Sequence, residues 1–185
     1  MKRTMILAAL AAAVLATGCA NTQTNGRIEP TYEEASKDRF LVANRAGLDA
    51  LIEGLDRDTY GGTPILVATV VNINDLRRSA PLGRTVSEQY ASQLVSRGYN
   101  VKELKLRGDV FVQEGTGELL LSREIKDIAK SHAAMLVLVG TYSSASNYTY
   151  ISLKLVRTED GRIIRAHDYA LPNDRDVTRL LQVAR

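Results

Sequence analysis

Apolar side chains recur at the three- and four-residue spacing of an α-helix in three segments of the chain. The segments are residues 38–60, with Ser36 or Asp38 as the N-cap; residues 81–97, stopped by Gly98 at the C′ position; and residues 122–129, capped by Ser122. In the second segment, apolar residues at i, i+4 spacing from Leu82 to Leu94 share one face. The pattern therefore predicts three helices, each with one face in a core.

Five other segments show the continuous apolar run or the two-residue alternation that is typical of β-strands. They are residues 65–71, 99–106, 134–140, 148–156 and 163–169. Residues 134–140 are the most apolar of these, so we expect them at the centre of the sheet. Residues 148–156 alternate between apolar and polar positions, and Asp160 and Gly161 turn the chain into the last strand. The last two strands are predicted to form a hairpin with one solvated face.

The order of these elements predicts an α/β (α+β) fold, in which a single domain holds a mixed β-sheet of about five strands, three helices and a C-terminal antiparallel hairpin. Parallel neighbours are expected wherever a helix joins two strands, and the hairpin adds antiparallel strands toward one edge. A domain spanning residues 36–185 is large enough to bury about 68–70% of its unfolded surface.

The N-terminus has the layout of a bacterial lipoprotein signal. A basic pair at residues 2–3 precedes an apolar run at residues 5–15, which is shorter than the roughly 20 residues of a membrane span. Cys19, the one cysteine of the chain, follows two small residues as in a lipobox, although Ala16 stands where lipoboxes usually have leucine. We predict a signal peptide at residues 1–18 and covalent lipid on Cys19. An ordinary secretory signal is the alternative.

A polar stretch separates the predicted lipid from the predicted domain. Residues 20–30 are polar, aperiodic and broken by Gly26 and Pro30, so they are expected to stay extended. We interpret residues 19–35 as a lipidated tether. Ala20 follows the cysteine in place of the aspartate that commonly retains lipoproteins in the inner membrane, which favours the outer membrane, with the domain facing the periplasm.

Charge and cysteine content narrow the function classes. The chain has 24 basic and 21 acidic residues, and loss of Lys2 and Arg3 with the signal lowers its formal net charge from +3 to +1. A nearly neutral chain lacks the basic footprint that nucleic-acid binding requires, so no nucleic-acid partner is expected. A single acylated cysteine leaves no thiol for a disulfide, and stability must come from the core.

The sequence contains no recognisable catalytic, metal or cofactor constellation. His132, at a helix end, and His167, expected on the solvated side of a strand, lack the spaced partners that a zinc site needs. The serines at 143, 144 and 146 lack a Gly-x-Ser-x-Gly elbow and are interpreted as a polar loop. Residues 115–118 are interpreted as a turn. We therefore predict no catalytic residue, no metal and no cofactor other than the lipid.

Tyrosines are the strongest candidates for contact with a partner. Tyr142, Tyr148, Tyr150 and Tyr169 flank the end of the predicted central strand and the solvated face of the hairpin. Tyrosine combines a rigid apolar ring with a polar tip and is enriched at interfaces, although cross-strand packing explains such residues equally well. Arg84, near Arg77 and Arg78, is a second candidate for an acidic partner, with a solvated face as the alternative.

Motifs along most of the chain resemble the FlgO family of flagellar outer-membrane lipoproteins. They are, in order, the run 65–71, Leu82-Gly83-Arg84, Arg97-Gly98-Tyr99, Leu121-Ser122-Arg123, Gly140-Thr141-Tyr142 and His167-Asp168-Tyr169. The resemblance implies a fold similar to the amino-terminal domain of TolB and a non-enzymatic protein at the flagellar base that supports flagellar stability, assembly and motility.

The partners implied are the outer membrane, reached through the lipid, and flagellar basal-body or other envelope proteins. Assembly into a homo-oligomer stays open. The alternative function is that of a regulatory envelope lipoprotein that docks onto a cell-wall synthase or secretion complex through the same fold, because a fold does not fix a function.

Overall fold

The computed structural model describes residues 29–104, 111–113, 119–121 and 123–182, and the chain divides into two units, residues 1–36 and 37–185. In the described part of the first unit, α2 (Tyr32–Ser36) is a short, exposed helix. A capping box starts it, because the Glu34 carboxylate accepts from the Thr31 amide at 2.8 Å and the Thr31 hydroxyl accepts from the Glu34 amide at 3.2 Å. The end of the predicted tether is therefore helical. Cys19 and the predicted signal lie outside the described residues.

The second unit is built on a mixed sheet with the strand order β3-β1-β6-β7-β8, in which β2 also pairs with β6. The strands are β1 (Ile65–Ala68), β2 (Val71–Asn72), β3 (Val101–Leu104), β6 (Leu136–Ser144), β7 (Tyr148–Arg157) and β8 (Ile163–Pro172). The pairs of β1 with β3 and β6 are parallel, whereas β7 pairs in antiparallel fashion with β6 on one side and β8 on the other. The predicted mixed sheet, its central strand and its C-terminal hairpin are confirmed.

Five described helices accompany this sheet: α3 (Arg39–Ile52), α4 (Arg57–Tyr60), α5 (Pro81–Ser96), α6 (Arg123–Ser131) and α7 (Arg175–Leu181). The first predicted helix is too long, because the chain turns at Gly54, whose φ is +66°, and Asp56 then caps the separate helix α4. The sequence pattern did not predict α7 or the antiparallel pair β4 (Phe111–Gln113) and β5 (Leu119–Leu121). Both strands are only three residues long and show no clear alternation. Ser122, residues 105–106 and residues 115–118 lie outside the described residues.

The predicted strand at residues 65–71 is interrupted at Thr69 and Val70, between β1 and β2. The Val70 amide donates to the Ser87 hydroxyl and the Val70 carbonyl accepts from the Ser79 hydroxyl, both at 2.8 Å. These bonds turn the backbone of Val70 from the sheet toward the start of α5. A Cβ on Gly83 would collide with the Val70 carbonyl oxygen, so only glycine permits this approach of helix and strand.

The C-terminus of α5 matches its sequence signal. The Gly98 amide donates to the Val95 carbonyl at 2.9 Å and the Tyr99 amide donates to the Leu94 carbonyl at 3.0 Å, which together form a Schellman motif. Gly98 has a φ of +83°, as a C′ glycine should.

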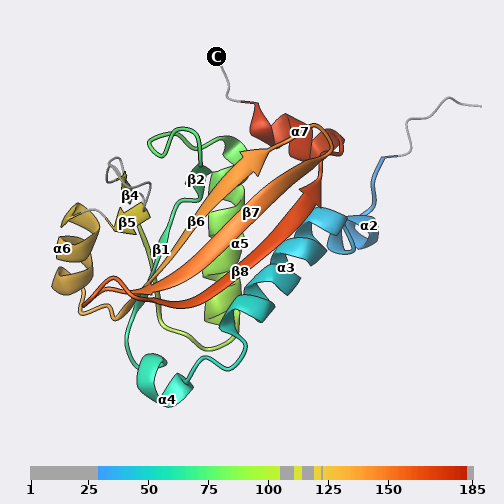
Figure 1. The fold of residues 1–185 in the computed structure, drawn as a ribbon. Coiled ribbons are helices and arrows are strands. Elements are labelled where there is room, and N and C mark those ends of the chain that lie inside the picture. The colour runs from blue at the N-terminus through green and yellow to red at the C-terminus, as the bar shows by residue number, and fades with distance from the viewer. Residues whose placement is uncertain (1–28, 105–110, 114–118, 122, 183–185) are drawn as a thin grey trace, which may run out of the picture. The chain divides into compact units, whose positions relative to one another are not determined.

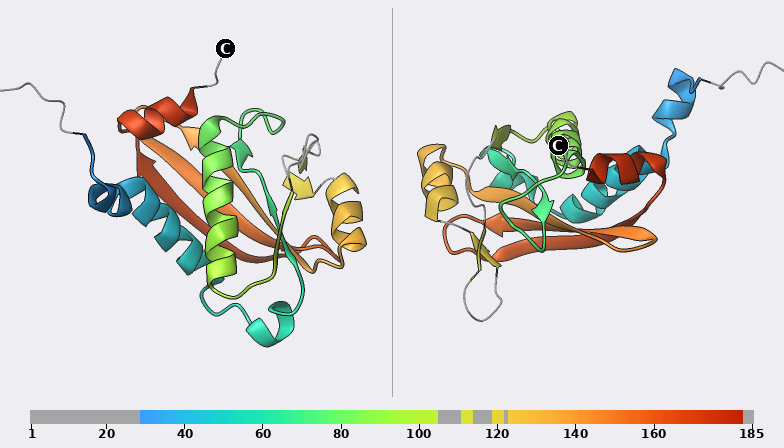
Figure 2. Two further views of the ribbon diagram at one scale, coloured as in Figure 1. Left: turned by 180° about the vertical axis from the view of Figure 1, so that it is seen from behind. Right: turned by 90° about the horizontal axis from the view of Figure 1, so that it is seen from above.

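One face of the sheet is covered by α3, α5 and α7, which the right panel of Figure 2 shows together on one side (Figures 1 and 2). The larger core lies between these layers and includes Leu48, Tyr90, Leu138 and Leu153, each at most 1% exposed. We call this side the covered face.

The opposite face of the sheet is covered by α6 over part of its area. Ile125 and Ala129 of α6 pack with Leu66 of β1 and with Val137 and Val139 of β6 in a second, smaller core. This core ends at the middle of β6, so the two faces of β7 and β8 have different surroundings. The candidate site lies on the part of this face that α6 leaves uncovered.

Candidate functional site

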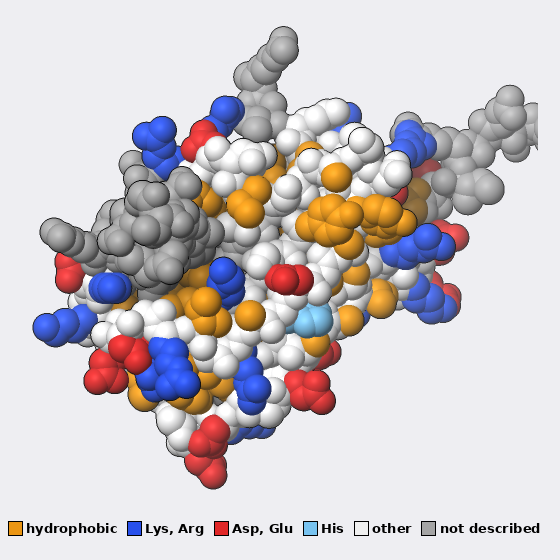
Figure 3. Space-filling view, in the orientation of Figure 1, with side chains coloured by type: hydrophobic (Ala, Val, Ile, Leu, Met, Phe, Trp, Pro, Cys, Tyr) orange, Lys and Arg blue, Asp and Glu red, His pale blue; other side chains and the backbone are white. Residues whose placement is uncertain are grey.

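On the sheet face opposite the covered face, the part that α6 leaves uncovered carries no described helix. We call this surface the open face and define it by the side chains that alternate with the buried ones on the last three strands, together with one loop residue: Ile73, Thr141, Ser143, Tyr148, Tyr150, Ser152, Asp168 and Ala170. Figure 3 looks onto this side and shows hydrophobic side chains gathered over the upper part of β7 and β8. Tyr148 is 47% exposed, Tyr150 is 53% exposed and Ile73 is 46% exposed.

A shallow hollow of about 410 Å³ lies in the open face. Its lining comes from the loop after β2 and from β6, β7 and β8: Ile73, Thr141, Ser143, Tyr150, Ile151, Ser152, Asp168, Tyr169 and Ala170. Most of the exposed lining is apolar, and among the described lining residues Asp168 is the only charged one. A hollow that is open to solvent fits a protruding side chain of another protein better than an enclosed small molecule.

The strand ends that carry Tyr148 and Tyr150 are firmly held. The Asn173 side chain donates to the Ala145 carbonyl at 2.6 Å and accepts from the Thr149 hydroxyl at 2.7 Å. The backbone amide of Asn173 donates to the Asn147 carbonyl at 2.9 Å. Thr149 is itself fully buried. The exposed tyrosines therefore stand on a fixed backbone, as a preorganised binding surface requires.

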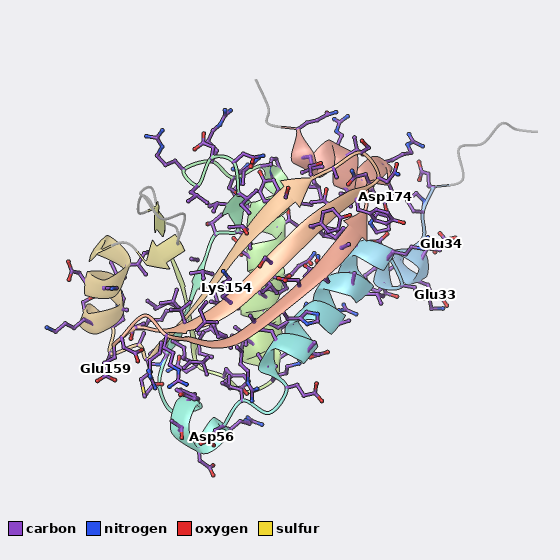
Figure 4. All side chains as sticks on the ribbon, in the orientation of Figure 1. Glu33, Glu34, Asp56, Lys154, Glu159 and Asp174 are labelled. Atoms are coloured by element: carbon purple, nitrogen blue, oxygen red, sulfur yellow. The ribbon has the colours of Figure 1, made fainter. Side chains whose placement is uncertain are left out.

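Register brings Tyr150 and Asp168 close together. Tyr150 pairs with Ala170, and Ser152 pairs with Asp168, so Tyr150 and Asp168 are diagonal neighbours on the same face. Such neighbours have Cα atoms about 7–8 Å apart, within reach of an aromatic side chain. Figure 4 labels Lys154 on this side of β7, two residues beyond Ser152. No ion pair joins Lys154 to Asp168 within the described part of the chain.

Two of the four predicted contact tyrosines belong to the covered face instead. Tyr142 is 4% exposed, and its hydroxyl accepts a hydrogen bond from the Ala80 amide at 2.9 Å, which holds the start of α5 against β6. A side chain buried in this way offers no surface to a partner. The prediction for Tyr142 is therefore corrected to a packing role.

Tyr169 also points into the covered face, where its ring lies against α3 at Gly47. A Cβ on Gly47 would stand 2.8 Å from this ring, so the glycine that weakens the helix also makes room for the tyrosine. The Tyr169 hydroxyl donates to Asn44 at 2.5 Å and bonds to the Tyr90 hydroxyl, and the Asn44 amide donates to Gln89 at 2.7 Å. The prediction for Tyr169 as a contact side chain is corrected in the same way.

Burial raises the pKa of both phenols in this network. The pKa of Tyr90 is raised mainly by desolvation, and also by the nearby Tyr169. Desolvation raises the pKa of Tyr169 as well, although the hydrogen bond from Tyr90 offsets part of the effect. Both phenols are therefore neutral at any physiological pH, and they act as structural hydrogen-bonding groups.

Arg84 is exposed but does not join the open face, because it lies on α5 on the opposite side of the sheet. Its guanidinium donates to the Ser79 carbonyl at 3.3 Å. Arg78 lines a separate pocket with Asn72, Asp75 and the buried Tyr142. The arginines remain a candidate for an acidic partner, distinct from the tyrosine surface.

The remaining chemical candidates carry no visible site. His167 pairs with Leu153 and stacks on Tyr169 with ring centroids 6.4 Å apart, so its placement on the solvated side was wrong. Ser143 and Ser144 lie in β6 and not in a loop. The described residues contain no group of three or more potential metal ligands. The described residues also form no helix with the length and apolar character needed to cross a membrane.

Sequence reasoning missed Asp168 and Ile73. The signal for Asp168 was present, because alternation places it on the side opposite Tyr169, in phase with Ala170. Ile73 carried no such signal, because it lies in the turn after β2 and reaches this position through a bond from its amide to the Tyr142 carbonyl at 3.0 Å.

Comparison with solved structures defines the class of the fold. The C-terminal domain of LpoB from Salmonella enterica superposes with a TM-score of 0.53 at 15% identity, covering 72% of this chain and 98% of that domain. The LpoB C-terminal domain from Escherichia coli gives 0.49 at 17% identity, with 72% and 98% covered. Lipoprotein GNA1162 from Neisseria meningitidis gives 0.42 at 13% identity, with 62% and 85% covered. The class of fold is therefore that of the LpoB C-terminal domain.

The family is shown by sequence. The FlgO protein family matches residues 46–176, which run from the second half of α3 to the start of α7. The chain belongs to the FlgO family, as its motifs predicted. A search of curated proteins found no match.

Proposed function

We propose that this chain is a lipid-anchored, non-enzymatic docking domain of the outer membrane that associates with the flagellar basal apparatus and supports flagellar stability and motility. The observation that carries the proposal is the FlgO family match over residues 46–176. The open face supports it, because an exposed apolar surface held on a rigid sheet is typical of a protein-binding site.

Deletion of the gene, followed by complementation with the full chain, tests the flagellar role. We expect swimming to be lost or strongly reduced and flagella to be missing or poorly attached in electron micrographs, with recovery on complementation. Unchanged swimming with intact flagella would refute the flagellar role.

The anchor is tested separately with Cys19→Ser. Each buried CH₂ of a lipid contributes about 0.8 kcal/mol to membrane binding, and stable attachment takes two or more chains. The variant should therefore move from the membrane fraction to the soluble periplasm. Persistence in the membrane fraction would show that acylation is not the anchor. Substitution of Thr17 by Ser, which keeps a small residue before the cut, is the matched control and should leave fractionation unchanged.

Crosslinking in intact cells tests the partner class. Recovery of flagellar ring or basal-body proteins is expected. Recovery of a cell-wall synthase or a secretion complex in their place would favour the regulatory alternative over the flagellar proposal.

A further inference from the structure

We propose that the open face binds a protein segment that presents an arginine among apolar residues, with Asp168 as its ion-pair partner and the Tyr150 ring as its stacking surface. The inference rests on the docking function proposed above and names the chemistry of the partner. It assigns separate roles to two side chains of the hollow and leaves Tyr148 and Ile73 as apolar surroundings.

The first argument is the cost of covering a lone carboxylate. Of the residues that the structure describes, Asp168 is the only charged one in the lining of the hollow, and none of the others forms an ion pair with it. A partner that seals the apolar surface would remove water from this carboxylate, which is strongly unfavourable unless a cation or several donors replace the water. An apolar or acidic occupant is therefore disfavoured, whereas a basic one has a matching charge.

The second argument is the position of the aromatic ring. Tyr150 and Asp168 are diagonal neighbours in the β7–β8 ladder, and both line the hollow. A cation that bonds to the carboxylate can therefore also lie over the tyrosine ring, within the roughly 6 Å at which cation–π attraction acts. Arginine suits this arrangement better than lysine because its planar guanidinium stacks on a ring and pairs with a carboxylate through two hydrogen bonds.

The third argument concerns the rest of the hollow. The hydroxyls of Ser143 and Ser152 can accept further N–H bonds from a guanidinium, while Ile73 and Ala170 provide apolar surface for its neighbours. Lys154 is the other diagonal neighbour of Asp168 in the β7–β8 ladder, but within the described part of the chain it forms no ion pair with this carboxylate and is not in the described lining. The carboxylate therefore remains available to an incoming cation.

A photo-crosslinking amino acid at Ala170, introduced into the full chain in living cells, tests the proposal. Adducts are compared in the original chain and in Asp168→Lys, Asp168→Asn, Tyr150→Phe and Tyr150→Ser backgrounds, and the crosslinked partner peptide is mapped by mass spectrometry. Asp127→Asn, an exposed carboxylate on α6, is the matched charge control. A crosslinker at Val42, 51% exposed on α3, is the position control.

The expected result is an adduct at Ala170 whose mapped segment contains an arginine. Its yield should fall about tenfold or more in Asp168→Lys and in Tyr150→Ser, less in Asp168→Asn, and stay unchanged in Tyr150→Phe and Asp127→Asn. Changing the mapped arginine to glutamate should restore the adduct in the Asp168→Lys background.

Several results would overturn the inference while the docking function stands. They are an adduct that Asp168→Lys leaves intact, a mapped segment without a basic residue, an adduct with a second copy of this chain, and no adduct at Ala170. A lysine in the mapped segment would overturn the preference for a guanidinium. The proposed function fails by a different measurement, namely normal motility after gene deletion, so the two failures are distinguishable. Circular dichroism and thermal unfolding of each variant identify any loss of folding.

Discussion

The two faces of β7 differ although they belong to the same ten residues. Thr149, Ile151, Leu153 and Leu155 point to the covered face and are at most 1% exposed, whereas Tyr148 and Tyr150 on the other side are about half exposed. The covered face is occupied by α3 and α5, and the open face by no described helix. The docking function proposed above accounts for large aromatic residues that are left exposed beside a filled core.

The contrast is tested most strongly on the covered face. Leu153→Ala removes a fully buried side chain and should lower the free energy of unfolding by about 2–5 kcal/mol, because the cavity cannot collapse between a sheet and two helices. Ser152→Ala, one residue away on the open face, should change it by less than about 0.5 kcal/mol. Urea unfolding measures both variants. Equal losses would show that the two faces are not energetically distinct.

The packing of α3 against β8 gives the next largest effect. Gly47→Ala should raise helix propensity by about 1 kcal/mol, yet its Cβ would stand 2.8 Å from the Tyr169 ring, and such overpacking costs about 1–3 kcal/mol. We expect a net loss of stability in thermal unfolding. Gly62→Ala, where a Cβ meets nothing within 4 Å, is the control and should be neutral or slightly stabilising. A more stable Gly47→Ala would refute the close contact.

The buried phenols predict a loss of stability at alkaline pH. The pKa values of Tyr90 and Tyr169 are raised in the folded state above their unfolded value of about 10, so the folded chain holds these protons more tightly. Their contribution is complete below about pH 10 and declines as the pH rises above it, by up to about 1.4 kcal/mol per pH unit for each group. Urea unfolding from pH 9 to 11 measures the slope.

Two variants distinguish the contribution of these phenols to the alkaline loss of stability from that of other groups. The double substitution Tyr90→Phe with Tyr169→Phe should flatten the slope, although it lowers stability at neutral pH because Asn44 loses a hydrogen-bond partner. Tyr148→Phe, on the exposed side, should leave the slope unchanged. A slope that persists in the double variant would assign it to other groups.

The smallest effect on stability is expected on the open face, together with the largest effect on function. Tyr148→Ser combined with Tyr150→Ser should change the free energy of unfolding by less than about 0.5 kcal/mol, because both side chains are about half exposed. Swimming in soft agar should nevertheless fall toward that of the deletion strain. Full motility in a stably folded double variant would show that the exposed tyrosines are not a docking surface.

Much of the fold follows from local patterns. Alternation in β7, the apolar run of β6, the cap at Asp38 and the Schellman motif at Gly98 depend on residues close in sequence, and the structure confirms each of them. The elements that were missed are short: α4 and α7 each have seven residues or fewer, and β4 and β5 have three each. Such segments contain too few residues to display a period.

The candidate site was only half predictable. Tyr148 and Tyr150 were placed correctly because alternation along one strand separates them from Ile151 and Leu153. Tyr142 was misplaced because its hydroxyl is held by Ala80, a contact across 62 positions that no local pattern encodes. Alternation along β8 places Asp168 on the same face as Ala170, but its closeness to Tyr150 depends on the register between two strands, which no local pattern encodes.

The sequence by itself determined the two-sided character of the last strands and the family of the chain, because each depends on residues within a short window or on a motif order along the chain. Lipid attachment at Cys19 stays a prediction from the sequence. Only the tertiary structure decided which side of the sheet the helices cover, and with it which tyrosines are packed and which are exposed. The physical reason is that a two-residue period distinguishes two faces but contains no information about what packs on either of them.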